Sequence, residues 1–306
     1  MTAEHSIWVE KYRPTTLDGY IGNEHVKTKF AQYIANQDIP HLLLTGVAGT
    51  GKSTLAKIVV HNIDCDLMFL NASDENSIEV MRSKIKGFAS SMGMAPLKIV
   101  VLDECDHISV PAQALLRNLM EQYSLTTRFI LTANYKERII DPLISRTQEY
   151  HITPPSIKEV CKHVGSILQQ ETVAYAPVDI KTMVEMYFPD IRKIINEIQL
   201  HVTDNKLQLD AQTVTNSDIP RRIIARLANP KKETALVDIR QLIANAHVRD
   251  YTDMYRALFD HIVEYAPESQ IGNVILSIAE GQYRDSLVVD KEITMIATIV
   301  NILNVF

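Results

Sequence analysis

Cysteine is scarce in this chain, and its spacing argues against whole classes of protein. Three cysteines occur among the 306 residues, at Cys65, Cys105 and Cys161, and none of them forms a C-x-x-C pair. Such wide spacing argues against both a zinc site and a disulfide framework. We therefore expect reduced thiols that are mostly buried.

Long hydrophobic runs are also missing. No apolar stretch approaches the about 20 residues that a membrane-spanning helix needs, and the opening segment MTAEHSIWVE lacks the pattern of a signal peptide. We therefore expect a soluble, cytoplasmic protein with no membrane partner. A chain of 306 residues with 46% hydrophobic content is long and apolar enough for a main domain with one or two smaller ones.

An excess of basic residues is absent as well. The formal net charge is −6, whereas proteins that bind nucleic acid usually carry a basic excess. Any contact with DNA must therefore be local. The chain also has no internal repeat of fixed period and no low-complexity tract.

The strongest motif that is present is GVAGTGKS, from Gly46 to Ser53. An apolar run precedes it and a segment with an apolar helical face follows it, which is the strand–turn–helix context of a phosphate-binding loop. Its glycines let backbone N–H groups approach an anion, and the helix N-terminus adds a partial positive charge. Lys52 is predicted to reach the β- and γ-phosphates of a nucleotide, and the Ser53 hydroxyl to ligate Mg²⁺.

Two carboxylates follow an apolar strand at Lys98–Glu104. A buried parallel strand delivers such acids to its carboxyl end, where ligands bind. Asp103 is predicted to hold Mg²⁺, usually through water, and Glu104 to deprotonate the attacking water. An Asp-Glu pair after a strand is common by itself, so the functional interpretation depends on the phosphate-binding loop upstream.

Further polar residues follow other predicted elements. Asn134 ends the apolar strand RFILTA and could position water near the γ-phosphate, although asparagine is also a common turn residue. Arg146 ends a short helical segment that begins near Ile139. Leu67–Asn71 is predicted to be a buried strand, and Ile78–Ser90 a helix with Val80, Ile85 and Phe88 inward.

Eight motifs together carry a resemblance to a known family. They are WVEKYRP, GVAGTGKS, FLNASDE, VVLDECD, AQALLRNLMEQYS, RFILTANY, DPLISR and FPDIRK, in this order over about residues 7 to 200. The chain resembles the clamp-loader AAA+ ATPases, in particular replication factor C small subunits and the large subunit of phage clamp loaders. The short chain and the weakly similar C-terminal region favour the phage subunit. Bacterial clamp-loader subunits carry a four-cysteine zinc module that is absent here.

The resemblance implies an α/β fold, with an AAA+ P-loop domain built on a parallel sheet, a small helical lid and an all-helical C-terminal collar. It implies ATP and Mg²⁺ as cofactors. Asn134 matches the first sensor, Arg146 the arginine finger that reaches a neighbouring subunit's ATP, and Arg192 the second sensor on the lid. The implied nucleotide contacts are Val9, Glu10, Lys11, Tyr12 and Ile21 around the adenine, Gly49, Thr50, Gly51, Lys52, Ser53 and Thr54 around the phosphates, and Arg192. Without the resemblance, the residues around Trp8 are equally consistent with an N-terminal arm that only packs on the core.

Two positions depart from the family pattern. The finger motif normally reads Ser-Arg-Cys and here reads Ser145-Arg146-Thr147; because the arginine is kept, we expect no effect. The family tends to place a basic residue shortly after the Ser-Asp of the second strand, where this chain has Asn76. That basic residue is thought to link DNA binding to the catalytic glutamate, so the coupling here is predicted to use other residues.

The predicted domains are residues 1–152 for nucleotide binding, 153–214 for the lid and 215–306 for the collar. Pro154-Pro155 marks the first boundary, and Ser156 with Glu159 forms a predicted capping box. Isoleucines at helical spacing predict core positions in the lid, at 191, 194, 195 and 198. In the tail, helices are predicted over 219–227, 232–244, 250–265, 269–283 and 290–303, the last with a stripe of Ile293, Ile296, Ile299, Val300 and Leu303. The tail is either its own small core or, as the family suggests, a collar that packs on neighbouring subunits.

The residues proposed to contact DNA are few. They are Arg82 and Lys84 on the 78–90 helix, Ser109 and Gln113 near the start of the helix that follows Asp103, and Arg138. Helix N-termini and a few cations can bind phosphates without net positive charge. The alternative is that these cations are ordinary surface charges.

The predicted function is that of an ATP-driven clamp-loader subunit, which opens a sliding clamp and loads it onto primer–template DNA. Its implied partners are other clamp-loader subunits, in a homo- or hetero-oligomer, the clamp, and the DNA; a phage protein would act in the cytoplasm of a bacterial host. A related AAA+ helicase loader or branch-migration motor is one alternative. A nucleotide-binding scaffold that does not hydrolyse ATP is another, although Glu104, Asn134 and Arg146 speak against it.

Overall fold

A computed structural model describes residues 7–73, 78–209, 211–228, 232–246 and 251–305. The chain divides into two compact units, Met1–Gln208 and Leu209–Phe306. Helix α10 (Ala211–Leu227) runs across the boundary predicted after residue 214, so the division falls before this helix. Asn76, one of the two departures from the family pattern, lies outside the described residues.

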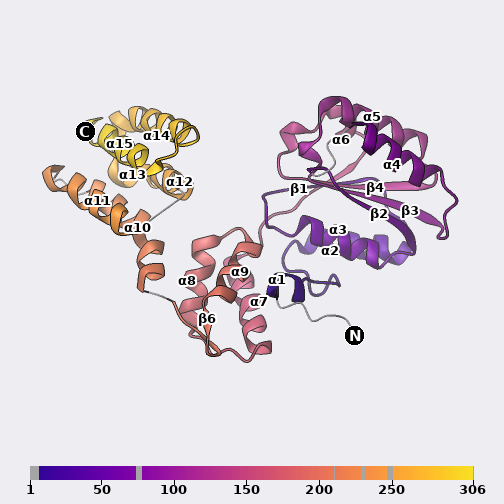
Figure 1. Cartoon of the computed structure of the whole chain (residues 1–306), viewed down its shortest axis with the longest axis horizontal. Helices are drawn as coiled ribbons and strands as arrows, with labels where there is room; N and C mark the ends of the chain where they lie inside the picture. The colour runs from indigo at the N-terminus through magenta and orange to yellow at the C-terminus, as the bar shows by residue number, and fades with distance from the viewer. Residues whose placement is uncertain (1–6, 74–77, 210, 229–231, 247–250, 306) are drawn as a thin grey trace. The chain divides into compact units, whose positions relative to one another are not determined.

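A five-stranded parallel sheet forms the centre of the N-terminal unit (Figure 1). Its strands are β1 (Leu42–Thr45), β2 (Cys65–Asn71), β3 (Leu97–Asp103), β4 (Thr127–Ala133) and β5 (Gln148–His151). They lie in the order β2-β3-β4-β1-β5. The order reverses beside β1, and ligands of open parallel sheets bind at the carboxyl ends of the strands at such a reversal.

Helices cover both faces of this sheet (Figure 1). On one face lie α2 (Glu24–Asn36) and α3 (Lys52–His61), and on the other α4 (Ile78–Ser90), α5 (Val110–Gln122) and α6 (Asp141–Ile144). Alternate residues of a strand point to opposite faces. Leu42 and Leu44 therefore pack with the α2–α3 layer, whereas Leu43 packs in the core on the other face.

One expectation about this unit needs correction. β2 is not a buried strand: it lies at the edge of the sheet, and the side chains of Leu67 and Phe69 are 43% and 39% exposed. An apolar run cannot reveal whether a strand is central or at an edge, because only the pairing order decides that. In α4, Ile85 is buried and Phe88 half-buried as predicted, while the side chain of Val80 lies outside the described residues.

The lid is part of the same N-terminal unit. It contains α7 (Ile157–Gln170), α8 (Pro177–Tyr187) and α9 (Ile191–Leu200), followed by a two-stranded hairpin, β6 (Val202–Thr203) and β7 (Lys206–Leu207), which was not predicted. The capping box is confirmed: Glu159 N donates to Ser156 Oγ, and Ser156 N donates to the Glu159 carboxylate. The N-terminal helix α1 (Trp8–Lys11) packs on α9, and the Trp8 backbone N–H donates to the Gln199 side chain at 2.9 Å.

The described part of the C-terminal unit contains only helices. They are α10, α11 (Lys232–Ala246), α12 (Thr252–Asp260), α13 (Ile262–Tyr265), α14 (Ile271–Asp285) and α15 (Lys291–Val305). The helix predicted over 250–265 is thus two helices. In the described part of the chain no helix is long and apolar enough to cross a membrane.

The buried face of α15 differs from the predicted stripe. Met295, Ile299 and Ile302 are fully buried, whereas Ile293 is 68% exposed. These buried positions are three or four residues apart, as a single helical face requires. The prediction was wrong at Ile293 because apolar residues lie on more than one face of this helix, so their spacing alone does not select the buried one.

Candidate active site

The loop between β1 and α3 has the shape of an anion cradle. Gly46 has φ of 143°, and a Cβ built on it would lie 2.3 Å from the Ile152 carbonyl oxygen. Gly49 has φ of 77°, and a Cβ there would lie 2.2 Å from Asp190 Oδ1 at the start of the lid helix α9. Only glycine avoids both the strained backbone and the clash. Helix α3 begins at Lys52, so its free N–H groups face the same loop.

Lys52 lies inside this cradle, with only 6% of its surface exposed. Its Nζ donates to the carbonyl oxygens of Gly46 and Val47, each at 2.8 Å. Burial lowers its pKa, while the carboxylates of Asp103, Asp106 and Glu104 act in the opposite direction and Arg192 adds to the lowering. A buried ammonium with carbonyl partners is a cation ready to exchange them for phosphate oxygens.

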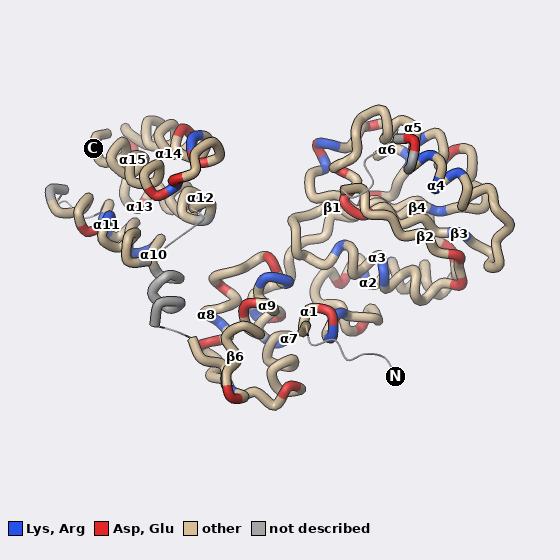
Figure 2. Tube along the Cα trace, viewed as in Figure 1, with Lys and Arg blue, Asp and Glu red and all other residues tan. Residues whose placement is uncertain are grey.

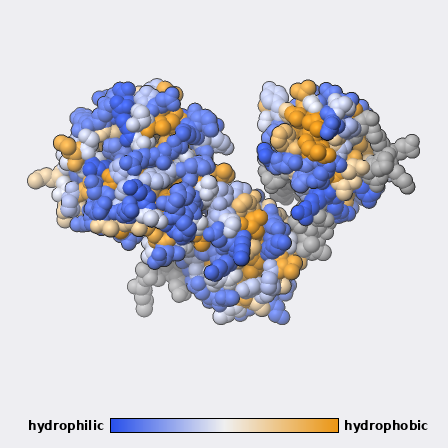
Figure 3. Space-filling view, turned by 180° about the vertical axis from the view of Figure 1, so that it is seen from behind, coloured by the Kyte–Doolittle hydropathy of each residue, from blue (hydrophilic) through white to orange (hydrophobic). Residues whose placement is uncertain are grey.

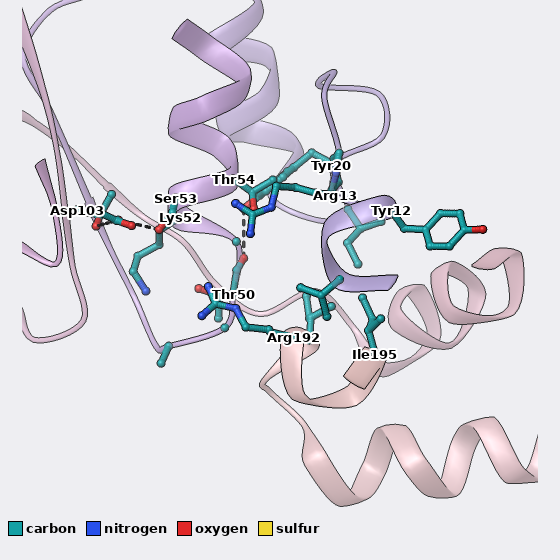
Figure 4. Close-up of a pocket in the computed structure, with 18 of the residues that line it drawn as sticks. Tyr12, Arg13, Tyr20, Thr50, Lys52, Ser53, Thr54, Asp103, Arg192 and Ile195 are labelled. Carbon is teal, nitrogen blue, oxygen red and sulfur yellow. Dashed lines mark hydrogen bonds between the residues drawn. The ribbon is translucent and has the colours of Figure 1, made fainter. Parts of the chain in front are cut away.

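Ser53 and Asp103 come together from α3 and β3. Ser53 Oγ donates to Asp103 Oδ1 at 2.7 Å (Figure 4). A hydroxyl and a carboxylate are hard oxygen donors of the kind that Mg²⁺ accepts in nucleotide sites. The two side chains predicted as metal ligands, 50 residues apart in the sequence, therefore fit the ion.

Thr132 on β4 holds the two acids in place, and sequence analysis missed it. Its Oγ1 donates to Asp103 Oδ1 and accepts a hydrogen bond from Glu104 N at 3.0 Å. Glu104 has φ of 58°, a left-handed conformation that a non-glycine residue adopts at a cost. The hydrogen bond that Glu104 N donates to Thr132 stabilises this conformation, in which Glu104 lines the pocket. The signal available was the threonine inside the motif RFILTANY.

Asn134 follows β4 and lines the same pocket as Glu104 and Thr132. Behind it, Asp106 is 4% exposed, and its Oδ2 accepts a hydrogen bond from Tyr135 N at 3.2 Å. The other oxygen, Oδ1, has no hydrogen-bond partner among the described residues. Asp106 thus fixes the backbone just after Asn134 and adds negative charge near Lys52.

The far end of the pocket comes from the N-terminal arm and the lid and contains several apolar side chains. Val9, Tyr12 and Ile21 lie on its wall, as predicted for the adenine end, together with Arg13 and Tyr20, which were not predicted. The Tyr20 hydroxyl donates to the Thr50 carbonyl oxygen at 3.3 Å. In Figure 4 the labelled side chains run from Asp103 and Lys52 past Thr50 and Arg192 to Ile195 and Tyr12.

Glu10 and Lys11, which were also predicted as nucleotide contacts, do not line this pocket. Glu10 pairs with Arg13, and Lys11 Nζ pairs with Glu171 of the lid at 2.8 Å. On a short helix only one side faces the pocket, and Val9 and Tyr12, three residues apart, occupy that side. The Tyr12 hydroxyl donates to the same Glu171 at 2.7 Å, which ties the arm to the lid.

The lid contributes Arg192, Ile191, Ile195 and His163 to the pocket. Arg192 is exposed toward it, one residue into α9. Both Ile191 and Ile195 lie on the pocket wall; Ile195 is buried as predicted, whereas Ile191 is only half-buried. Ile194 and Ile198 are buried in the lid, at 0% and 1% exposed.

Arg146 does not lie among the residues that line this pocket. It forms an ion pair with Glu121, and its Nη1 donates to the Pro142 carbonyl oxygen at 2.8 Å. It lines a separate shallow depression with Arg128 and Thr147. The helical segment before it is shorter than predicted, because Ile139 and Ile140 are extended and only Asp141–Ile144 is helical.

Among the proposed DNA contacts, Arg82, Lys84, Ser109 and Arg138 are exposed, and the Arg138 guanidinium stacks on the Tyr135 ring at 4.7 Å. Gln113 is corrected: it is 1% exposed and bonded on both sides, to the Arg138 carbonyl and from Ile140 N, each at 2.8 Å. Its amide therefore fastens the 138–140 segment to α5. Figure 2 shows basic and acidic residues interspersed along the described chain.

Comparison with known proteins places this geometry in a family. Residues 42–154 match the family described as "ATPase family associated with various cellular activities (AAA)". The replication factor C small subunit of Aeropyrum pernix is 34% identical over 298 residues, which covers 95% of this chain and 86% of that protein. The chain belongs to the replication factor C small-subunit family of AAA+ clamp-loader ATPases.

Other relatives agree with this assignment. The replication factor C small subunit of Natronomonas pharaonis is 34% identical, with 91% of this chain and 89% of that protein covered. Among solved structures, the Thermotoga maritima RuvB Holliday junction branch migration motor has a TM-score of 0.56 at 17% identity, covering 81% of this chain and 91% of that chain. At that identity the likeness shows the shared fold alone. The predicted α/β AAA+ fold with a parallel sheet and a helical C-terminal region is thus confirmed.

Proposed function

We propose that this chain is an ATP-driven subunit that opens a sliding clamp and loads it onto primer–template DNA. The observation that carries the proposal is the separation of two sets of catalytic groups. Lys52, Ser53, Asp103 and Glu104 line one pocket, and Arg146 does not line it. A site that needs an arginine finger must then receive it from a neighbouring subunit, so hydrolysis depends on assembly.

Each side chain has a distinct part in ATP hydrolysis. Lys52 exchanges its carbonyl partners for oxygens of the β- and γ-phosphates, and the loop amides support them. Ser53 and Asp103 would hold Mg²⁺, which would supply positive charge to neutralise the phosphates. Glu104 accepts the proton of the attacking water, and Asn134 beside it orients that water.

The lid and the arm respond to the nucleotide in this proposal. Arg192 lies between the loop and the far end of the pocket (Figure 4), where it can reach phosphate oxygens from α9. Glu171 joins Tyr12 and Lys11 of the arm to the lid. A bound nucleotide therefore contacts loop, arm and lid together, and its hydrolysis changes how firmly they are held.

The collar is proposed to join subunits. Figure 3 shows apolar patches on the face of the C-terminal unit turned toward the viewer. Among its exposed side chains, Leu276, Leu287 and Ile293 are 69%, 68% and 68% exposed. Exposed apolar side chains of this size favour contacts with other subunits.

DNA contact in this proposal depends on Arg82, Lys84, Arg138 and the backbone near Ser109 at the N-terminus of α5. These groups recognise phosphates rather than bases, so binding should ignore sequence. A helicase loader or a branch-migration motor shares the ATPase chemistry, and a scaffold would share only the nucleotide pocket. The intact Glu104 and its support from Thr132 favour hydrolysis over a scaffold.

A clamp-loading assay tests the proposal. The chain is assembled with its partner subunits and mixed with its cognate clamp, labelled across a clamp interface, and with primed circular DNA. Clamp opening and retention on DNA should require ATP, and Lys52→Ala assemblies should do neither. An assembly that hydrolyses ATP without opening or retaining the clamp would contradict clamp loading and leave the other motor activities to be assayed.

A further inference from the structure

One polar side chain in the pocket has no part in the phosphate chemistry. His163 on α7 lines the same pocket as Ile191 and Ile195, which are apolar and come from α9. Its two neighbours along the buried face of α7, Val160 and Val164, are 0% and 1% exposed and belong to the lid core. His163 is half-buried, and the packed helix α7 fixes its position on the side of the lid that lines the pocket.

The imidazole of His163 has no hydrogen bond to another described residue; only its backbone carbonyl is engaged, as the acceptor from Ser166 Oγ. The ring nitrogens of His163 are not among the described side-chain atoms that are fully buried and lack a hydrogen-bond partner. They therefore remain accessible from the pocket. Burial alone lowers its pKa, with no carboxylate or cation contributing. By contrast, three acids and Arg192 act on Lys52 at the phosphate end.

Helix α7, which carries His163, is joined to the arm at the far end of the pocket, because Glu171 at its C-cap accepts a hydrogen bond from the Tyr12 hydroxyl at 2.7 Å. This contact places α7 and His163 at the end of the pocket away from Lys52. A neutral imidazole offers one donor and one acceptor. The edge of adenine that carries N7 and the N6 amino group offers the complementary acceptor and donor. The other described lid residues that line the pocket are Ile191, Arg192 and Ile195.

We propose that His163 hydrogen-bonds the edge of the adenine base and makes the pocket selective for it. This inference rests on the proposed ATPase function, since it takes ATP as the nucleotide. When a nucleotide analogue lacks the matching group on its base, the imidazole loses a hydrogen bond that water cannot replace beside apolar side chains. Such analogues therefore bind more weakly than ATP. If His163 only filled space, a ring of the same size would serve equally well.

The experiment measures equilibrium binding of ATP, 7-deaza-ATP and the triphosphate of purine riboside, which lacks the N6 amino group. Wild type should bind at least one analogue roughly 3- to 10-fold more weakly than ATP, the size of one net hydrogen bond. His163→Phe keeps a ring but removes both nitrogens. It should bind ATP weaker by a similar factor and no longer distinguish that analogue.

Two further variants sharpen the test. His163→Gln keeps a donor and an acceptor and should restore part of the discrimination, whereas Lys162→Ala, on an exposed neighbour in α7, should match wild type. His163→Phe with unchanged ATP affinity and unchanged discrimination would overturn the role of His163. Failure of the proposed function would give a different result. Wild type would then bind none of the three nucleotides, or the Lys52→Ala variant would bind them as tightly as wild type does.

Discussion

Most buried polar side chains of the described N-terminal unit lie around one pocket, whereas those of the C-terminal unit lie within a helical core. In the first unit Thr45, Thr50, Lys52, Asp106 and Thr132 are buried at or next to the pocket, and Lys98, Gln113 and Thr127 are buried elsewhere. In the described part of the second, the buried polar side chains are Asp285, Thr294 and Thr298, within a core dominated by isoleucine. Parallel strands bring distant residues to a common edge, and helices packed side by side mainly share apolar faces.

This contrast teaches where chemistry and assembly reside in the chain. In the N-terminal unit the pocket contains the buried charge of Lys52 and the left-handed Glu104, both of which cost stability and both of which the proposed ATPase chemistry uses. The C-terminal unit keeps most of its polar groups outside and leaves large apolar side chains exposed. We therefore expect substitutions in the first unit to alter catalysis, and substitutions in the second to alter stability or assembly.

The largest effect is expected where catalysis and assembly depend on each other, at Arg146. In the assembly, Arg146→Ala should lower ATP turnover by about 10³-fold or more, because the neighbouring site is deprived of its finger. The measurement is steady-state hydrolysis at saturating ATP. Mixing Arg146→Ala subunits with Lys52→Ala subunits should recover part of the rate, since some sites then combine an intact loop with an intact finger. Full activity of Arg146→Ala assemblies would remove the finger role.

The next largest effect concerns Glu104. Glu104→Gln should bind ATP normally and lower single-turnover hydrolysis by about 10²- to 10⁴-fold, because only the base for the attacking water is removed. Glu149→Gln is the matched control: Glu149 lies on β5 and pairs with Lys136 outside the pocket. Wild-type turnover of Glu104→Gln would show that this unit is not the ATPase described above.

A third variant acts on the C-terminal unit alone. Ile299→Ala removes a fully buried side chain from its core and should lower the unit's free energy of unfolding by about 2–5 kcal/mol. Chemical denaturation followed by far-ultraviolet circular dichroism should show the change in one transition, with ATP affinity of the N-terminal unit unaltered. Ile293→Ala, on the same helix but 68% exposed, should change stability by less than about 0.5 kcal/mol. Equal destabilisation by both variants would contradict the observed face of α15.

The smallest effect is expected for DNA. In the ATP-bound assembly, Lys84→Ala/Arg138→Ala should weaken the salt dependence of primer–template binding. The slope of log binding constant against log salt concentration should become shallower by roughly 0.9 for each phosphate that is no longer neutralised. Lys158→Ala/Lys162→Ala removes the same charge from exposed positions on the lid and serves as the control. Identical slopes for the two double variants would show that DNA contacts other residues than Lys84 and Arg138.

Much of the active site was predictable because phosphate chemistry requires contiguous residues. GVAGTGKS and the Asp-Glu pair each depend on short-range geometry, so Lys52, Ser53, Asp103 and Glu104 could be named from the sequence. Thr132 and His163 could not, because an isolated threonine in a strand or histidine in a helix has no local pattern that marks its partner. Glu10 and Lys11 belong to the motif but lie outside the pocket lining, because a motif names a whole segment, while a helix turns only one side toward the pocket.

The amino-acid sequence by itself determined the nucleotide-binding loop between a strand and a helix, the strand that ends in Asp103, and the capped start of the lid, since each follows from interactions within a few residues. Only the tertiary structure decided that β2 lies at the edge, that Gln113 is buried, that Ile299 rather than Ile293 faces the core, and that Arg146 lies outside its own pocket. These depend on strand pairing and on contacts between residues far apart in the chain, which periodicity and motif spacing do not encode.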